Sequence, residues 1–140
     1  MTDRTSPAIT VGVGVVVFRD RDVLLIRRGK PPFLGQWSIP GGRLEFAEPL
    51  MAAALREVRE ETAIEARVTG LIGAFEALPS VTGDPARHMV MIDYAAEWLS
   101  GEPAAGDDAA EAQFFAYDDA LRKVAWDDTR RAVEMAAAMM

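Results

Sequence analysis

The alternation of hydrophobic and polar positions predicts most of the strands of this chain. Residues 9–18 alternate and then run apolar with repeated valines, which is strong β character. The charged residues 19–22 predict a turn, and residues 23–27 predict the returning strand of a hairpin. Four further strands are expected, the first and last of them short: residues 37–39, 66–77, 88–98 and 113–117.

The clearest helix is predicted from Pro49 to about Thr62, because proline is favoured in a first helical turn. Its apolar residues follow the i, i+3, i+4, i+7 spacing of a buried stripe: Met51, Ala54, Leu55, Val58 and Thr62. Helical segments are also expected after Tyr117 and after Asp127. Segments rich in helix- and strand-breaking or polar residues predict loops and one turn: residues 29–35 with adjacent Pro31 and Pro32, the Pro-Gly-Gly turn at 40–42, 79–87 and 101–110.

The order of these elements predicts the fold class. Two strands, a helix, two strands and a helix give an α/β fold of the α+β type, with a largely antiparallel or mixed sheet. We expect one domain over residues 1–140, with residues 1–8 flexible, because the sequence contains no repeats and no linker. Half of the residues are hydrophobic, so a chain of this length can bury a core without disulfides.

Composition narrows the chemistry. The absence of cysteine excludes disulfides, thiol nucleophiles and cysteine-ligated metal sites, and the single histidine is too few for a histidine-rich site. No apolar run is long enough to cross a membrane, and no secretory segment is visible, so we expect a cytoplasmic protein without a membrane partner. The net charge of −7 argues against a nucleic-acid polymer as partner, but a small phosphate ester can be held through divalent cations.

Three carboxylates of the predicted helix project from one side, because Glu57, Glu60 and Glu61 are three and four residues apart. Like charges at this spacing repel, and the negative end of the helix dipole adds to the repulsion. A divalent cation such as Mg²⁺ would turn these hard oxygen ligands into a coordination site. The alternative is a solvated acidic face with Arg56 and Arg59 as partners.

The spacing around these glutamates resembles the conserved box of the Nudix hydrolase family. Residues 42–64 supply the matching positions in register: Gly42, Glu48, Arg56, Glu57, Val58, Glu60, Glu61 and Ile64. Ala63 stands where the family usually has glycine, which predicts a different geometry at the end of the helix. The resemblance implies the Nudix fold, a mixed β-sheet between helices, with the box as a loop–helix–loop.

The resemblance also implies a reaction, the Mg²⁺- or Mn²⁺-dependent hydrolysis of a pyrophosphate bond. Glu57, Glu60 and Glu61 are then metal ligands, together with the backbone carbonyl of Gly41. Either Glu57 or Glu60 orients or deprotonates the attacking water, and Arg56 holds a neighbouring glutamate in place. A carboxylate outside the box often completes such sites; Glu111 is the first choice over Asp107 and Asp108, with a solvated acidic loop as the other interpretation.

The substrate is expected from similarity to the ADP-ribose pyrophosphatase-like branch of the family. The similar stretches are residues 27–29, 35–37, 39–42 and 106–111, together with Pro79. The expected products are AMP and ribose 5-phosphate. Candidate substrate contacts are Arg27, Arg28, Trp37, Gly42 and His88, and aromatic residues that could stack on a base, although most are expected in the core, are Phe33, Trp37, Phe46, Phe75, Tyr94 and Phe115.

Two other functions stay open. One is a housecleaning nucleoside triphosphate pyrophosphohydrolase, which would release a nucleoside monophosphate and pyrophosphate. The other is a non-catalytic ligand sensor with the same fold, which the full set of glutamates disfavours. A homodimer is also plausible, because residues 132–140 are rich in alanine and methionine; the same segment could instead cover its own sheet.

Overall fold

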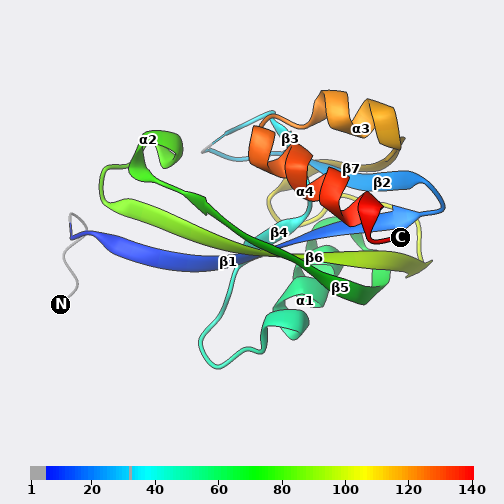
Figure 1. Cartoon of the computed structure of the whole chain (residues 1–140), viewed down its shortest axis with the longest axis horizontal. Coiled ribbons are helices and arrows are strands. Elements are labelled where there is room, and N and C mark those ends of the chain that lie inside the picture. Colours follow the sequence, from blue (N-terminus) through cyan, green and yellow to red (C-terminus); the bar gives the residue numbers. More distant parts are fainter. Residues whose placement is uncertain (1–5, 32) are drawn as a thin grey trace.

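The computed structural model describes residues 6–31 and 33–140 (Figure 1). Most of the N-terminal segment expected to be flexible, residues 1–5, and position 32 of the expected first loop lie outside this range. Ala8, the last residue of that segment, already belongs to a strand. The elements are β1 (Ala8–Arg19), β2 (Asp22–Arg28), β3 (Trp37–Ser38), β4 (Gly41–Arg43), α1 (Leu50–Thr62), β5 (Glu65–Ala77), α2 (Pro79–Thr82), β6 (Arg87–Ser100), β7 (Ala109–Ala116), α3 (Tyr117–Lys123) and α4 (Asp127–Ala138).

The strands form one mixed sheet, which confirms the predicted fold class. β1 and β2 make the predicted antiparallel hairpin, with Phe18 opposite Val23. β1 runs parallel to β6 on its other side, and β5 closes that edge antiparallel to β6. β7 pairs antiparallel with β2. Helix α1 lies on one side of this sheet, and α3 and α4 lie on the other (Figure 1).

Three local predictions were wrong in detail. The expected turn at residues 40–42 contains the start of β4, because Gly41 and Gly42 pair with Gly14 and Val13 of β1. The expected loop at 79–87 holds the short helix α2. β7 begins at Ala109, four residues before the predicted start, since its pairing with the long strand β2 extends the ladder to Arg28.

Helix α1 differs from its prediction at the end and on its buried face. Ala63 has φ of 62°, the left-handed conformation that glycine usually supplies, so the expected change of cap geometry does not occur. Its N–H donates to the carbonyl of Arg59 at 2.9 Å. Met51 was expected in the buried stripe but is 51% exposed. The buried face is turned instead toward Glu57 and Glu61, because β4 contacts that side of the helix.

The core has one part on each side of the sheet. Val13, Val15 and Val17 of β1 pack toward α1, while Val16 and Phe18 pack on the other side, toward α3 and α4. Helix α4 contributes its buried residues to that second part: Ala132, Val133 and Ala136. The C-terminal segment therefore covers its own sheet, and the homodimer stays a prediction.

One buried carboxylate interrupts the second side of the sheet. Asp93 of β6 is 6% exposed, and its Oδ1 atom has no hydrogen-bond partner. Its partners on the two neighbouring strands are both glycines, Gly14 and Gly73. Burial raises the pKa of Asp93 to about 6, and the charge of Asp128 on α4 adds to the effect.

We expect Asp93→Asn to raise the free energy of unfolding at about pH 7.5 by about 2 kcal/mol, because the amide carries no charge to desolvate. The folded-state pKa of about 6 lies above the ordinary value of 3.8, so the folded protein holds this proton more tightly. As pH rises from 3.8 to about 6, the unfolded chain gives up this proton before the folded protein does, so the free energy of unfolding falls over that range. The gain in the variant should disappear at about pH 4 in urea unfolding experiments.

The control is Glu97→Gln, on the same strand as Asp93. It removes the carboxylate of an exposed ion pair with Arg67 of β5. It should change the unfolding free energy by no more than about 0.5 kcal/mol at either pH. A gain in Asp93→Asn that does not depend on pH would contradict the assignment of the cost to a buried charge.

Candidate active site

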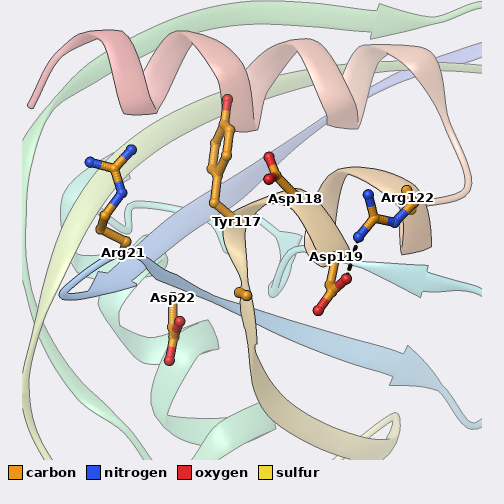
Figure 2. A pocket seen from close by; sticks show the side chains of 7 residues that line it. Arg21, Asp22, Tyr117, Asp118, Asp119 and Arg122 are labelled. Atoms are coloured by element: carbon orange, nitrogen blue, oxygen red, sulfur yellow. Dashed lines mark hydrogen bonds and ion pairs between the residues drawn. The ribbon is translucent and has the colours of Figure 1, made fainter.

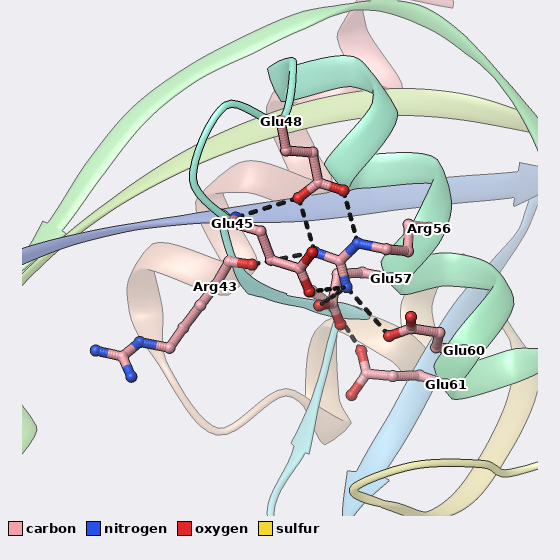
Figure 3. A network of polar contacts seen from close by, with 8 residues as sticks. Arg43, Glu45, Glu48, Arg56, Glu57, Glu60 and Glu61 are labelled. Atoms are coloured by element: carbon pink, nitrogen blue, oxygen red, sulfur yellow. Dashed lines mark hydrogen bonds and ion pairs between the residues drawn. The ribbon is translucent and has the colours of Figure 1, made fainter.

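Arg56 is the centre of a network that joins the loop after β4 to helix α1 (Figure 3). Its guanidinium donates two hydrogen bonds to Glu48, at 2.7 and 2.9 Å. It also donates to Glu57 at 2.8 Å, to Glu60 at 3.1 Å and to the carbonyl of Arg43 at 3.2 Å. One cation thus holds two glutamates of the helix and ties both ends of the preceding loop to them.

The electrostatics of this network agree with its geometry. The hydrogen bonds that Arg56 donates lower the pKa of Glu48, and those accepted by Glu48 and Glu57 raise the pKa of the guanidinium above its ordinary value. The side chains of Arg56 and Glu48 are only 19% and 14% exposed. A two-pronged Arg–carboxylate pair of this kind fixes orientation as well as charge, which a lysine cannot do.

The two glycines of β4 allow the helix to approach the sheet closely. A Cβ atom on Gly42 would lie 2.6 Å from the carboxylate of Glu57, and one on Gly41 would lie 2.2 Å from the carbonyl oxygen of Val13. The N–H of Gly41 donates to Oε1 of Glu61 at 2.8 Å. These two glycines therefore let the backbone of β4 lie directly against the glutamates.

Burial makes negative charge unfavourable on the inner side of the helix. It raises the pKa of Glu57, against the effect of Arg56, and it raises the pKa of Glu61 to about 7, against the hydrogen bond from Gly41. The nearby charge of Arg28 lowers the pKa of Glu61 and so partly opposes this rise. Two carboxylates held in this way would be stabilised by added positive charge.

A third acidic side chain completes the cluster. One carboxylate oxygen each from Glu57, Glu60 and Asp107 lies within 4.8 Å of the others. Asp107 belongs to the loop before β7, which is fastened to the end of α1: the N–H of Gly106 donates to the carbonyl of Glu61 at 3.2 Å. A Cβ on Gly106 would lie 2.5 Å from the carbonyl oxygen of Glu60, so this contact requires glycine.

The carboxylate chosen first from the sequence is paired with an arginine. Glu111 is within β7 rather than in the loop, and Oε2 accepts a hydrogen bond from Nε of Arg27 at 2.6 Å. Asp108 pairs with Lys30 at 3.0 Å. The sequence offered the GDD stretch as a signal for Asp107, but the pairing of β7 with β2, which decides which acid faces α1, is not visible in it.

The remaining candidate residues are spread over two regions. Arg28, at the end of β2, lies close enough to Glu61 to lower its pKa, whereas Arg27 pairs with Glu111 and Trp37 packs edge-on against Phe115. His88 lies at the start of β6, where its Nε2 is 2.9 Å from Glu76. In the part of the chain that the structure describes, no hydrogen bond or ion pair joins His88 to the box glutamates.

The aromatic residues divide as expected between core and surface. Tyr94 is buried, and Trp37, Phe75 and Phe115 pack against the core. Phe33 and Phe46 are exposed, Phe46 completely.

A separate hollow of about 380 Å³ lies at the turn between β1 and β2 and the start of α3 (Figure 2). Its lining mixes both charges: Arg21, Asp22, Ala116, Tyr117, Asp118, Asp119 and Arg122. It contains none of the residues predicted for the site. Arg122 is already paired with Asp119. The hollow therefore does not mark the reaction site.

Comparison with known proteins gives one consistent family. The model of the family described as NUDIX domain matches residues 8–136. An ADP-ribose pyrophosphatase of Methanocaldococcus jannaschii is 38% identical over 84% of this chain and 67% of that protein. NAD-capped RNA hydrolase NudC of Pseudomonas aeruginosa is 33% identical over 80% of this chain and 38% of its own length. A solved structure, the MutT NUDIX hydrolase of Burkholderia pseudomallei, has a TM-score of 0.76 at 30% identity and covers 91% of this chain and 98% of that one.

Over residues 6–31 and 33–140, no helix is long and apolar enough to cross a membrane.

We expect Arg56→Lys to lower the free energy of unfolding by about 2 kcal/mol, because an ammonium group cannot replace the paired hydrogen bonds to Glu48 and still reach Glu57. Urea unfolding at neutral pH measures the change. Arg59→Lys on the same helix is the matched control: Arg59 is half exposed and lies 3.8 Å from Glu65, so its replacement should change little. Equal effects of the two variants would contradict the central role of Arg56.

Proposed function

Because the chain belongs to the Nudix family of hydrolases, we propose that it hydrolyses the pyrophosphate bond of ADP-ribose to AMP and ribose 5-phosphate, with Mg²⁺ or Mn²⁺ as cofactor. The observation that supports this most is the acidic cluster of Glu57, Glu60 and Asp107 beside the buried Glu61. Its members come from a helix and a loop far apart in sequence, and Arg56 fixes two of them.

The residues present fit a divalent cation. The cluster offers hard carboxylate oxygens, which Mg²⁺ and Mn²⁺ prefer, and with Glu61 its negative charges outnumber the nearby cations Arg56 and Arg28. A cation bound there supplies positive charge to the phosphate oxygens and makes water more acidic. We assign Glu57, Glu60, Glu61 and the carbonyl of Gly41 as ligands, with Asp107 as the additional one. Glu111, whose Oε2 accepts a hydrogen bond from Arg27, stays the alternative to Asp107.

The protein groups have distinct parts in this proposal. Glu57 or Glu60 takes the proton of the attacking water, as the two carboxylates that project beside Asp107. Arg56 is a positioning residue, since it donates hydrogen bonds to both of them. Gly42 leaves the space in which Glu57 sits.

The substrate is proposed from the relatives and from charge. The M. jannaschii relative is an ADP-ribose pyrophosphatase, and it matches most of this chain. Arg28 lies close enough to the cluster to lower the pKa of Glu61, so its charge also favours phosphate groups there. Arg27, Trp37 and His88 are proposed as further contacts, toward the remaining parts of the substrate. The partner is a small nucleotide rather than a nucleic-acid polymer.

We expect the purified protein with millimolar-scale Mg²⁺ to release AMP and ribose 5-phosphate from ADP-ribose, and to lose this activity in EDTA. A panel of NADH, nucleotide sugars, dinucleoside polyphosphates and nucleoside triphosphates, read by chromatography, provides the comparison. Release of pyrophosphate from a triphosphate in preference would replace ADP-ribose as the substrate and support the housecleaning function. Binding of ADP-ribose without turnover of any compound would support the sensor.

We expect Glu60→Gln to reduce turnover by about 100-fold or more and to weaken Mn²⁺ binding. Removing a residue that only supports a metal ligand already reduces metal affinity or activity by about 10- to 100-fold, and Glu60 is proposed as a ligand itself. Electron paramagnetic resonance of Mn²⁺ measures binding without turnover. Glu65→Gln is the control, because Glu65 is exposed and pairs only loosely with Arg59. Normal Mn²⁺ binding by Glu60→Gln would remove Glu60 from the ligand set.

A further inference from the structure

The loop between β6 and β7 carries Asp107 and is fastened at its start, middle and end to other parts of the protein. It covers residues 101–108, and we call it the acid loop. Asp107 has φ of 53°, the left-handed conformation that residues with a side chain rarely adopt. Such a conformation persists where the surrounding structure holds it, and it is found most often at functional sites. The contacts that hold this loop therefore decide where the Asp107 carboxylate lies.

The start of the acid loop is anchored by Trp98, a half-buried residue of β6 that packs against the core. Its indole N–H donates to the carbonyl of Gly101 at 2.8 Å. Gly101 has φ of 98°, and a Cβ on it would lie 2.9 Å from the carbonyl oxygen of Ala63, the residue that caps α1. The loop thus begins in contact with the C-terminal end of the helix that carries the glutamates.

Arg19, the last residue of β1, supports this anchor. Its guanidinium lies 5.5 Å from the centre of the Trp98 ring and 4.0 Å from that of Phe114 on β7, distances typical of cation–π contacts. It also donates a hydrogen bond to Glu102 of the acid loop, at 3.4 Å. Charge and ring contacts thus hold Trp98 and the first residues of the loop together.

The middle of the acid loop is bonded to the last turn of α1. The N–H of Ala104 donates to the carbonyl of Thr62 at 2.9 Å, and that of Gly106 donates to the carbonyl of Glu61 at 3.2 Å. The last four carbonyls of a helix have no partner within it, so the loop satisfies groups that would otherwise need water. Gly106, the residue before Asp107, is thereby fixed against the helix.

The end of the acid loop is held by the segment after β2. The N–H of Gly29 donates to the carbonyl of Asp108 at 2.8 Å, and the ammonium group of Lys30 lies 3.0 Å from the Asp108 carboxylate. Asp107 therefore lies between two fixed neighbours. One of its carboxylate oxygens is within 4.8 Å of those of Glu57 and Glu60. Because like charges repel, a loop without these anchors would place the carboxylate farther from the glutamates.

We propose that Trp98 and Gly106 are positioning residues for the metal site. They hold the acid loop on α1, so that Asp107 lies beside the glutamates before any cation binds. This rests on the proposed function, in which Asp107 is a ligand. A ligand that is already in place loses less conformational freedom when the cation binds, so the affinity for the cation rises. Trp98 acts through the backbone of the loop, and Gly106 acts through the close approach that its missing side chain allows.

Binding of Mn²⁺ without substrate, followed by electron paramagnetic resonance, tests the proposal. We expect Asp107→Ala to weaken binding by about tenfold or more, since even groups that only support a ligand are worth about 10- to 100-fold. Gly106→Ala should weaken it by about tenfold. Trp98→Phe, which keeps a ring and loses the indole N–H, should weaken it by about fivefold. Neither change should weaken binding further once Asp107 is alanine, because both act through that carboxylate.

Gly70→Ala is the matched control and should bind Mn²⁺ as the wild type does, because its added methyl group would meet only the flexible end of Met139. Losses that add in the double variants would overturn the proposal, since the changes would then disturb the glutamates of α1 themselves. Normal binding by Asp107→Ala would overturn it as well. Normal binding by Gly106→Ala or Trp98→Phe would overturn it for that residue. Circular dichroism confirms folding; should Gly106→Ala not fold, Trp98→Phe carries the comparison.

Amide hydrogen exchange of the metal-free protein tests whether the loop is held before a cation binds. We expect the N–H groups of Ala104 and Gly106 to be protected in the wild type and equally in Asp107→Ala. In Trp98→Phe they should exchange about fivefold faster, because one hydrogen bond of the anchor is lost. Unprotected N–H groups at both positions of the wild type would overturn the proposal.

Hydrolysis of ADP-ribose is measured beside Mn²⁺ binding, so that each proposal can fail alone. The expected pattern of Mn²⁺ binding without hydrolysis of ADP-ribose would keep the positioning residues and remove the substrate. Hydrolysis of ADP-ribose together with normal Mn²⁺ binding by Gly106→Ala and Trp98→Phe would keep the proposed function and overturn the positioning residues.

Discussion

The close contact between β4 and α1 is the constraint on which the rest of the site depends. A single carbon atom added at Gly42 would overlap the carboxylate of Glu57, and one added at Gly41 would overlap the backbone of β1. Because both positions are glycine, the helix can place Glu57 and Glu61 against the sheet rather than in solvent. Gly41 then supplies an N–H to Glu61, and Arg56 supplies charge to Glu57.

This arrangement places acidic groups where folding alone would not. Glu57, Glu61 and Asp93 are all at least nine-tenths buried, and burial raises the pKa of each. Each carboxylate therefore lowers the stability of the folded chain at neutral pH unless positive charge or a hydrogen-bond donor is added. Such groups are typical of functional sites, where stability is given up for binding and chemistry.

The two sides of the sheet have different tasks in this account. The side of α1 gathers acid groups suited to cations and phosphates, and the side of α4 combines apolar residues with one buried acceptor. β4 is the short strand beside β1 that contacts α1. The same strand thus positions the groups that we assign to the reaction.

The sequence by itself determined the local elements and the ligands on the helix. Periodicity predicted the hairpin, the helix and the long strands, because each depends on residues near one another in the chain. The spacing of Glu57, Glu60 and Glu61 identified one acidic side of a helix for the same reason. It also misplaced details: Met51 was assigned to the core, and Ala63 was expected to change the helix end.

Only the tertiary structure decided which distant groups meet. The pairing of β7 with β2 turned Glu111 toward Arg27 and left Asp107 beside the glutamates. The parallel pairing of β1 with β6 placed Asp93 against Gly14, some eighty residues away in the chain, and left its carboxylate without a partner. Strand register and the approach of helix to sheet arise from packing of the whole chain, so no local pattern could encode these contacts.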